Sequence, residues 1–314
     1  MARVALSLLS ASLCAMAQFS SLAVTDDGGQ VYFLSERPLK SERSRTLPAS
    51  GLYRIERHAD GMYGSPVVFR APSTTPRRES YRRLAVGISG DGTAVLWNDA
   101  THPGPGCGSL CNSTPWTYTT MLASAGSDTV ETYRGLGRIS RNGRYLLSSD
   151  YEKLLVDRPQ QTFVRVSLLP EGTPVDQVFG VTSNGQVLVR TGENLAIWTT
   201  SGNKVLTRGV SYANAVISDD GRTVVYVDRQ NLLTAVDTAS GRVLLTSAGS
   251  SDPSLSNNGE RLLFTREANS EKQVFLADLT GASNTRQLTS VSGGVQAAVL
   301  AGFGMKAFRD RARW

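Results

Sequence analysis

Residues 216–227 read VISDDGRTVVYV, and this stretch decides the fold. Apolar residues lie on both sides of Asp220-Gly221, a pair that accepts the positive φ required by hairpin turns. The stretch therefore predicts one strand, a tight turn and a second strand. The same pattern occurs at five other places along the chain, so it is an internal repeat.

The six copies of the repeat align on the glycine of the turn. Asn or Asp precedes this glycine in every copy: Asp27-Gly28, Asp91-Gly92, Asn142-Gly143, Asn184-Gly185, Asp220-Gly221 and Asn258-Gly259. A hydroxyl residue lies three positions before the glycine: Thr25, Ser89, Ser140, Thr182, Ser218 and Ser256. Such a hydroxyl can bond backbone groups at the entrance of the turn. Paired apolar residues follow each turn, which indicates strands with neighbours on both faces.

The turn glycines are separated by 64, 51, 42, 36 and 38 residues in chain order. Blades of a β-propeller repeat at about 40 to 50 residues. The spacing therefore predicts an all-β fold, a propeller of four-stranded antiparallel blades with six complete repeats. Residues 297–304 begin an incomplete seventh repeat with its turn near Gly304. Because a propeller closes its last blade to avoid an exposed sheet edge, we expect a six- or seven-bladed ring with a truncated or irregularly closed last blade.

The N-terminus has the features of an export signal. Arg3 precedes an apolar run over residues 4–13, and Ala15-Met16-Ala17 is an A-x-A cleavage site. We therefore expect a signal peptide at residues 1–17, the propeller at 18–308, and an irregular tail at 309–314. The apolar run is too short to span a bilayer. Leu13 precedes Cys14 where a lipoprotein signal needs a small residue, so we expect an unanchored periplasmic or extracellular protein.

The net charge of +6 is modest for 314 residues, and the basic residues are scattered. This balance argues against nucleic acid as a partner. The densest basic group comprises Arg77, Arg78, Arg82 and Arg83, within a connection rich in Pro, Ser and Thr. A solvated loop is the favoured interpretation of this group, and an anion site is the alternative.

Two cysteines, Cys107 and Cys111, lie in a loop rich in Gly and Pro. In an exported protein, thiols four residues apart favour a local disulfide. A metal site would need further ligands, and His58 and His102 are the two histidines of the sequence. His102 with the two cysteines leaves a fourth ligand unfilled, so we expect neither a metal nor another cofactor.

The sequence contains no recognisable catalytic constellation. Two histidines exclude most hydrolytic arrangements, and no Gly-x-Ser-x-Gly elbow is present. The adjacent carboxylates Asp26-Asp27 and Asp219-Asp220 are interpreted as a turn residue with a solvated neighbour, in preference to a calcium or acid–base site. We therefore expect a protein that is not an enzyme.

The early repeats carry long insertions, at residues 38–50, 71–79 and 99–115. Loops of this kind are where a propeller face gains specificity. Trp97 and Trp198 are expected to pack between blades, whereas Trp116 beside the third insertion can be either core or a sugar platform. The candidate binding residues are Trp116, His102, Arg77 and Arg78.

The hydroxyl-x-[Asn/Asp]-Gly motif with its apolar followers resembles the WD40-like (PD40) repeat of the TolB-type β-propellers. The resemblance covers about residues 22–308. The family's proline between the hydroxyl and the Asp is replaced in every copy: Asp26, Gly90, Arg141, Ser183, Asp219 and Asn257. The resemblance implies an exported, non-enzymatic platform that binds a protein or a component of the cell envelope. The alternative is the propeller portion of a larger enzyme, a prolyl-oligopeptidase-type peptidase or a carbohydrate-active protein, whose catalytic domain lies outside this sequence.

Overall fold

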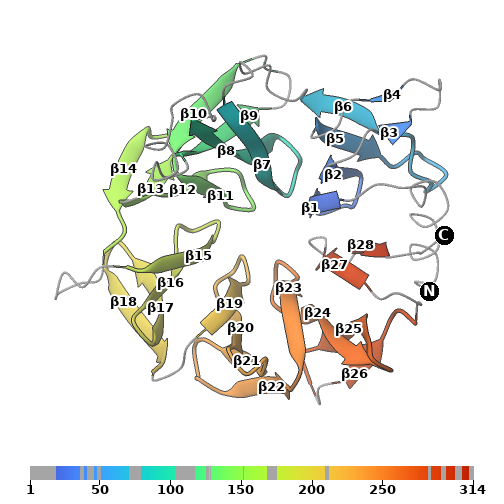
Figure 1. Ribbon diagram of the computed structural model, residues 1–314. Helices are drawn as coiled ribbons and strands as arrows, with labels where there is room; N and C mark the ends of the chain where they lie inside the picture. The colour runs from blue at the N-terminus through green and yellow to red at the C-terminus, as the bar shows by residue number, and fades with distance from the viewer. Residues whose placement is uncertain are drawn as a thin grey trace.

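The computed structural model describes residues 19–35, 39–40, 46–47, 51–70, 79–103, 117–124, 127, 129–150, 152–167, 175–208, 212–281, 284–290, 295–300 and 306–310. Within these ranges all regular structure is β-strand, and it forms a ring of six four-stranded antiparallel sheets (Figure 1). The fold is a six-bladed β-propeller, which confirms the prediction made from the turn repeat.

Each blade is built from one continuous part of the chain. Blades 1 to 3 comprise β1 (Phe19–Val24), β2 (Gln30–Ser35), β5 (Gly51–Glu56) and β6 (Val67–Arg70); β7 (Glu79–Ile88), β8 (Ala94–Pro103), β9 (Thr117–Ser124) and β10 (Val130–Arg134); and β11 (Leu136–Ile139), β12 (Tyr145–Ser149), β13 (Lys153–Asp157) and β14 (Thr162–Arg165). Blades 4 to 6 comprise β15 (Gln177–Val181), β16 (Val187–Thr191), β17 (Asn194–Thr199) and β18 (Gly202–Thr207); β19 (Tyr212–Ile217), β20 (Thr223–Asp228), β21 (Leu233–Asp237) and β22 (Val243–Ser247); and β23 (Ser250–Leu255), β24 (Arg261–Ala268), β25 (Glu271–Asp278) and β26 (Asn284–Gln287).

The first strand of every blade lies on the inside of the ring. Strands β1, β7, β11, β15, β19 and β23 contact one another in that order, and the fourth strands form the outer rim (Figure 1). A two-stranded sheet, β27 (Val295–Leu300) with β28 (Lys306–Asp310), lies between blade 6 and blade 1. Strand β27 contacts both β23 and β1, so it completes the inner ring in the position of a seventh blade.

The hydrophobic core is divided among the junctions between neighbouring blades. The paired apolar residues after each turn supply one side chain to each junction, because successive residues of a strand point to opposite faces. In blade 2, Val95 packs with blade 1 and Leu96 packs with blade 3. In blade 5, Val224 packs with blade 4 and Val225 packs with blade 6. The repeat therefore encodes the stacking of blades as well as the hairpin.

The turns have the conformation that the Asn-Gly and Asp-Gly pairs favour. The six turn glycines have φ between 67° and 81°, a region that residues with a Cβ adopt at a cost of about 1–2 kcal/mol. At the fifth turn the Ser218 hydroxyl accepts the N–H of Thr223 at 2.9 Å, and Asp220 Oδ1 accepts the N–H of Arg222 at 3.0 Å. The hydroxyl thus occupies backbone donors at the mouth of the hairpin, as expected from its position.

Some boundaries differ from the sequence prediction. Residues 99–103, predicted as the start of an insertion, continue β8, where Asp99 pairs with Arg83 and with Thr119. The reason is that β7 and β8 form a hairpin of ten-residue strands, longer than in the other blades. Strand β28 runs to Asp310, two residues into the segment predicted as irregular. Within the first insertion, β3 (Leu39–Lys40) and β4 (Thr46–Leu47) form a small separate sheet.

Candidate functional site

The six turns meet at the axis of the ring. The contacts involve one position of the repeat, the residue that follows the hydroxyl residue and precedes the Asn or Asp of the turn. This axial position holds Asp26, Gly90, Arg141, Ser183, Asp219 and Asn257 in blades 1 to 6. Gly90 is buried and the other five residues are half-buried. The residues come from turns that are as much as 231 positions apart in the sequence, and the fold places them within hydrogen-bonding distance.

Hydrogen bonds connect the six turns in an unbroken circle, which we call the axial ring. The backbone N–H of Asp26 donates to Gly90 O at 2.7 Å, and that of Gly90 donates to Arg141 O at 2.5 Å. The following links are Asn142 N to Ser183 Oγ (3.1 Å), Ser183 N to Asp219 Oδ1 (2.8 Å), Asp219 N to Asn257 O (3.0 Å) and Asn257 Nδ2 to Asp26 Oδ2 (2.9 Å). Every blade is thus bonded to the next, and blade 6 to blade 1.

Arg141 bridges the axial ring from one side to the other. Its guanidinium forms an ion pair with Asp26 of blade 1 and donates through Nε to Asn257 Oδ1 of blade 6 at 2.9 Å. The Arg141 and Asp26 side chains expose 23% and 28% of their surface, so the pair is partly shielded from water. The three side chains form a latch that connects blade 3 to the two blades flanking the β27–β28 sheet.

The axial ring also explains why residue 90 is a glycine, although its φ is not positive. A Cβ at Gly90 would overlap the carboxylate of Asp26. The carboxylate can therefore reach Arg141 and Asn257 only because blade 2 carries no side chain at this position.

The carboxylates at the axial position do not behave as solvated neighbours, so that prediction was wrong. Asp26 is held by Arg141 and Asn257, and Asp219 accepts the N–H of Ser183. The turn residue beside Asp26 has the expected local role. The hydroxyl of Thr25 and the N–H of Gly29 bond the Asp27 carboxylate and lower its pKa below the usual value.

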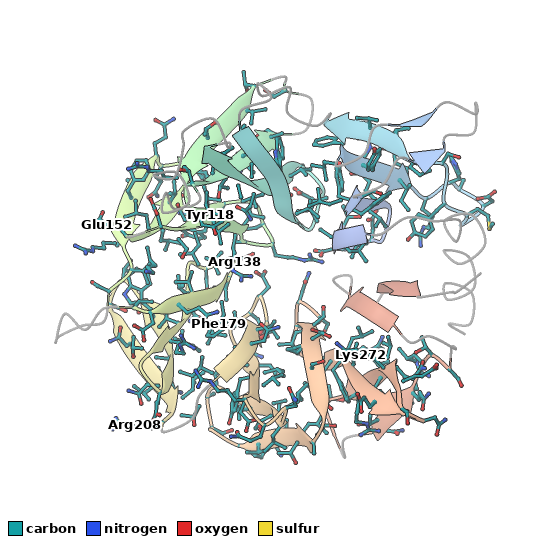
Figure 2. All side chains as sticks on the ribbon, viewed as in Figure 1. Tyr118, Arg138, Glu152, Phe179, Arg208 and Lys272 are labelled. Carbon is teal, nitrogen blue, oxygen red and sulfur yellow. The ribbon has the colours of Figure 1, made fainter. Side chains whose placement is uncertain are left out.

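A second feature of the inner wall is Arg138 on β11, near the middle of the ring (Figure 2). Burial among protein atoms lowers the pKa of its guanidinium. The side chain is nevertheless exposed to solvent. These two observations agree if the side chain lies in a solvated space enclosed by the ring. Among the described residues, none forms a hydrogen bond or an ion pair with Arg138.

A polar cleft of about 400 Å³ lies between blades 4 and 5. Gln186, Lys204 and Thr238 line it together with the backbone of Gly221. The Lys204 ammonium donates to the carbonyl of Thr238, which fixes one wall of the cleft to the other. The cleft is therefore a junction between blades that is already joined by its own polar groups.

Several residues predicted as site candidates lie outside the described residues: Trp116, Arg77, Arg78, Cys107 and Cys111. The disulfide and the loop-face site remain predictions for this reason. His102 lies near the end of β8, where its backbone pairs with Ser80. Trp97 and Trp198 are 3% and 2% exposed and pack between blades, as predicted.

The connected ring of axial residues and Arg138 were not predicted, although the aligned repeats contain a signal for them. The axial position takes five residue types in six copies, while the hydroxyl, the Asn or Asp and the glycine around it stay alike. The residue five before the glycine is small or aliphatic in five copies and arginine in blade 3: Ala23, Gly87, Arg138, Gly180, Val216 and Ser254. Deviations from a repeat mark positions with a role beyond architecture.

Within the described part of the chain, no group of three or more His, Cys, Asp or Glu side chains is placed to hold a metal ion. No helix among the described residues has the length and apolar character needed to cross a bilayer.

No known protein family model matches the chain, and no curated protein sequence matches it. Among solved structures, the fold is similar to "Oligogalacturonate lyase in complex with manganese", with a TM-score of 0.57. The alignment covers 82% of this chain and 76% of the lyase chain at 12% sequence identity. At this identity the similarity shows a shared propeller fold. The resemblance to the TolB-type propellers stays a prediction.

Proposed function

We propose that the chain is an exported, non-enzymatic β-propeller that binds a protein or a component of the cell envelope through the face carrying the six turns. The observation that carries this proposal is the variability of the axial position within an otherwise constant repeat. Architecture alone requires the hydroxyl, the turn residue and the glycine, which recur in every copy. The axial residues differ between copies and hold the six turns in one asymmetric arrangement, and a face without rotational symmetry suits one particular partner.

The axial ring supports this proposal through its rigidity. Hydrogen bonds between all six turns hold the face in one arrangement. A surface that is fixed before binding loses little conformational entropy when a partner docks. The Asn or Asp directly before the turn glycine is exposed in every blade: Asp27, Asp91, Asn142, Asn184, Asp220 and Asn258. Polar groups around the axis therefore remain accessible to a partner.

Site-specific photo-crosslinking in the cell envelope tests the proposal. A photoreactive residue is placed at Thr93 or at Glu260, which are both exposed beside turns of the proposed face. The matched control is Phe163 on the outer strand β14, whose side chain is 63% exposed. We expect the two turn-face positions to yield the same discrete adduct and the rim position to lack it. Adducts from Phe163 alone, or from no position, contradict the proposal.

A second candidate function is the propeller portion of a carbohydrate-active enzyme, and the fold similarity to oligogalacturonate lyase favours it. The purified chain is incubated with oligogalacturonate in the presence and absence of manganese, and unsaturated products are followed by ultraviolet absorbance. Under the leading proposal we expect no product in either condition. Product formation that depends on the chain would favour the enzyme.

The export part of the proposal is tested separately. N-terminal sequencing of the protein recovered from the envelope or the medium should begin at Gln18. Recovery in the cytoplasm with Met1 intact contradicts export, whatever the crosslinking shows.

A further inference from the structure

In the other five blades, small or aliphatic residues occupy the position equivalent to Arg138. The equivalent residues of the other five blades are Ala23, Gly87, Gly180, Val216 and Ser254. Four of these are half-buried rather than buried, so solvent reaches the wall at this level. Arg138 is the one long side chain among the six positions, and none of the others is a carboxylate that could neutralise it.

Two of the glycines give the direction in which a side chain leaves the wall at this level. A Cβ on Gly87 would lie 3.6 Å from Ile139 Cγ2 of the next blade, and a Cβ on Gly180 would lie 3.5 Å from Ile217 Cγ2. The position therefore points along the wall toward the next blade. In blade 3 the same direction leads toward blade 4, where the residue equivalent to Ile139 and Ile217 is the half-buried Val181, which has no polar group to pair with an arginine. Figure 2 places Arg138 near the middle of the ring, and its side chain is exposed to solvent.

The electrostatic situation of Arg138 differs from that of Arg141. Arg141 is paired with Asp26 and bonded to Asn257. The Arg138 guanidinium is partly desolvated, and within the described residues no group forms a hydrogen bond or an ion pair with it. A desolvated cation without a counter-ion is unfavourable, and an anion that pairs with it recovers part of the lost solvation.

The axial ring restricts access to Arg138 from one side. Arg138 lies on β11, which ends at Ile139, and Arg141 follows in the turn, so the axial ring lies at the turn end of this strand. There, three side chains from blades 1, 3 and 6 meet across the axis. A ligand therefore reaches Arg138 from the face of the propeller opposite the turns.

We propose that Arg138 binds the carboxylate group of an acidic ligand that enters the ring from the face opposite the turns. The planar guanidinium can donate two parallel hydrogen bonds to a carboxylate, and one such pair balances one charge on each side. The N–H and C=O of the neighbouring Gly137 are already bonded to Asn98, so the site offers the ligand the guanidinium rather than this N–H. The site is separate from the turn face, and it holds whether or not that face binds a protein.

Isothermal titration calorimetry at matched ionic strength tests the proposal with two probes. Citrate represents a small organic acid, and a pentaglutamate peptide with both ends blocked represents acidic side chains of a protein segment. The proteins are the wild type, Arg138→Gln, Arg138→Lys and the control Arg134→Gln. Arg134 has an 88% exposed side chain on the outer strand β10, so its replacement removes one charge from the rim alone.

We expect the wild type and Arg134→Gln to bind at least one probe with equal affinity, and Arg138→Gln to bind it at least tenfold more weakly. Arg138→Lys should lie between them, because it keeps the charge and loses the two-pronged geometry. The probe that binds distinguishes a small acid from an acidic segment. Equal binding by Arg138→Gln and the wild type, or no millimolar binding of either probe by the wild type, overturns the proposal. Since no described residue forms a hydrogen bond or an ion pair with Arg138, its replacement should not lower the melting temperature, and a melting curve of each variant checks this.

Discussion

The junction between blades 2 and 3 and the junction between blades 6 and 1 close the same ring by different means. At the first junction, Asn98 of β8 is 4% exposed and bonds both backbone groups of Gly137 on β11, donating at 3.1 Å and accepting at 2.7 Å. The Thr120 hydroxyl donates to Asn98 Oδ1 at 2.8 Å. Around these polar groups, Leu96, Leu122 and Leu146 form part of a continuous apolar core.

At the second junction two strands stand in place of four. Strands β27 and β28 pair with each other and fill the space between blade 6 and blade 1. Phe33 and Tyr53 of blade 1 are stacked with ring centroids 5.6 Å apart and are 2% and 0% exposed, on the face of the blade away from blade 2. A direct polar link between blades 6 and 1 is the bond from Asn257 to Asp26, supported by Arg141.

The difference shows two ways of holding neighbouring blades together. Where complete sheets stack, a buried amide is fixed inside an apolar core. Where a complete sheet is lacking, side chains at the axis connect the flanking blades across the gap. Substitutions at the two junctions should therefore differ in the size and the kind of their effect on stability.

The largest effect is expected from Asn98→Ala at the junction of blades 2 and 3. The change leaves the N–H and C=O of Gly137 buried without Asn98, and we expect a loss of about 3 kcal/mol in the free energy of unfolding. Urea unfolding followed by circular dichroism measures it. The matched control is Asn214→Ala, an exposed asparagine on β19, with an expected change within about 0.5 kcal/mol. Equal losses for the two variants would contradict the role of the buried amide.

At the junction of blades 6 and 1, Arg141→Ala should reduce stability by about 1–2 kcal/mol. The substitution leaves the half-buried Asp26 carboxylate without its cation, and partial solvent exposure limits the loss. Arg165→Ala removes a rim arginine from an ion pair whose side chains are 67% and 58% exposed, and should cost less than about 0.5 kcal/mol. If Arg141→Ala has the smaller effect in thermal melts, the latch does not stabilise the ring.

Gly90→Ala should cost about 1 kcal/mol, because the new methyl group displaces the Asp26 carboxylate from the latch. In an Asp26→Ala background the same substitution should cost close to nothing, since the group it displaces is gone. A double-mutant cycle in urea measures the coupling between the two positions. If Gly90→Ala lowers the free energy of unfolding equally in both backgrounds, the methyl group does not act through the Asp26 carboxylate.

The smallest effect concerns pH. The Thr25 hydroxyl and the Gly29 N–H lower the pKa of Asp27 in the folded protein. The ionised carboxylate therefore contributes its full stabilisation of the fold at pH values above the unfolded pKa of 3.8. This contribution is lost as the pH falls through the lower pKa of the folded state. Asp27→Asn should therefore lose less melting temperature than the wild type between pH 6 and pH 3. Asn258→Asp, at the equivalent turn of blade 6, should become more acid-sensitive, because Oδ1 of residue 258 accepts the Ser256 hydroxyl and the N–H of Glu260. The opposite order would contradict this account of the turns.

The sequence was sufficient for the fold because each repeat encodes local structure. The hairpin follows from Asp220-Gly221, and the stacking of blades follows from pairs such as Val224-Val225, which are apolar on both faces. The third strand of blade 5, Leu233–Asp237, pairs with the second strand of the hairpin in the same repeat. These features depend on neighbours along the chain or on a regular spacing.

The axial contacts could not be predicted in the same way. The bond between Asn257 and Asp26 joins residues 231 positions apart, and that between Arg141 and Asn257 joins residues 116 apart. Their meeting depends on how far each blade turns about the axis, which no single repeat specifies. The sequence did show where Asp26, Arg141 and Asn257 stand in the repeat, and comparing the copies with one another would have selected them.

Each blade is made from its own continuous run of strands, and this has a mechanical consequence. Among the described residues, no strand of one blade belongs to the sheet of another. The ring is therefore a series of separate sheets that closes at one point, between blade 6 and blade 1. To open the ring between blade 6 and blade 1, the latch must break and β27 must move, while the five junctions between complete blades stay intact. Partial unfolding should therefore begin there and leave an open arc of blades, which hydrogen exchange would show as early loss of protection in β1 and β23.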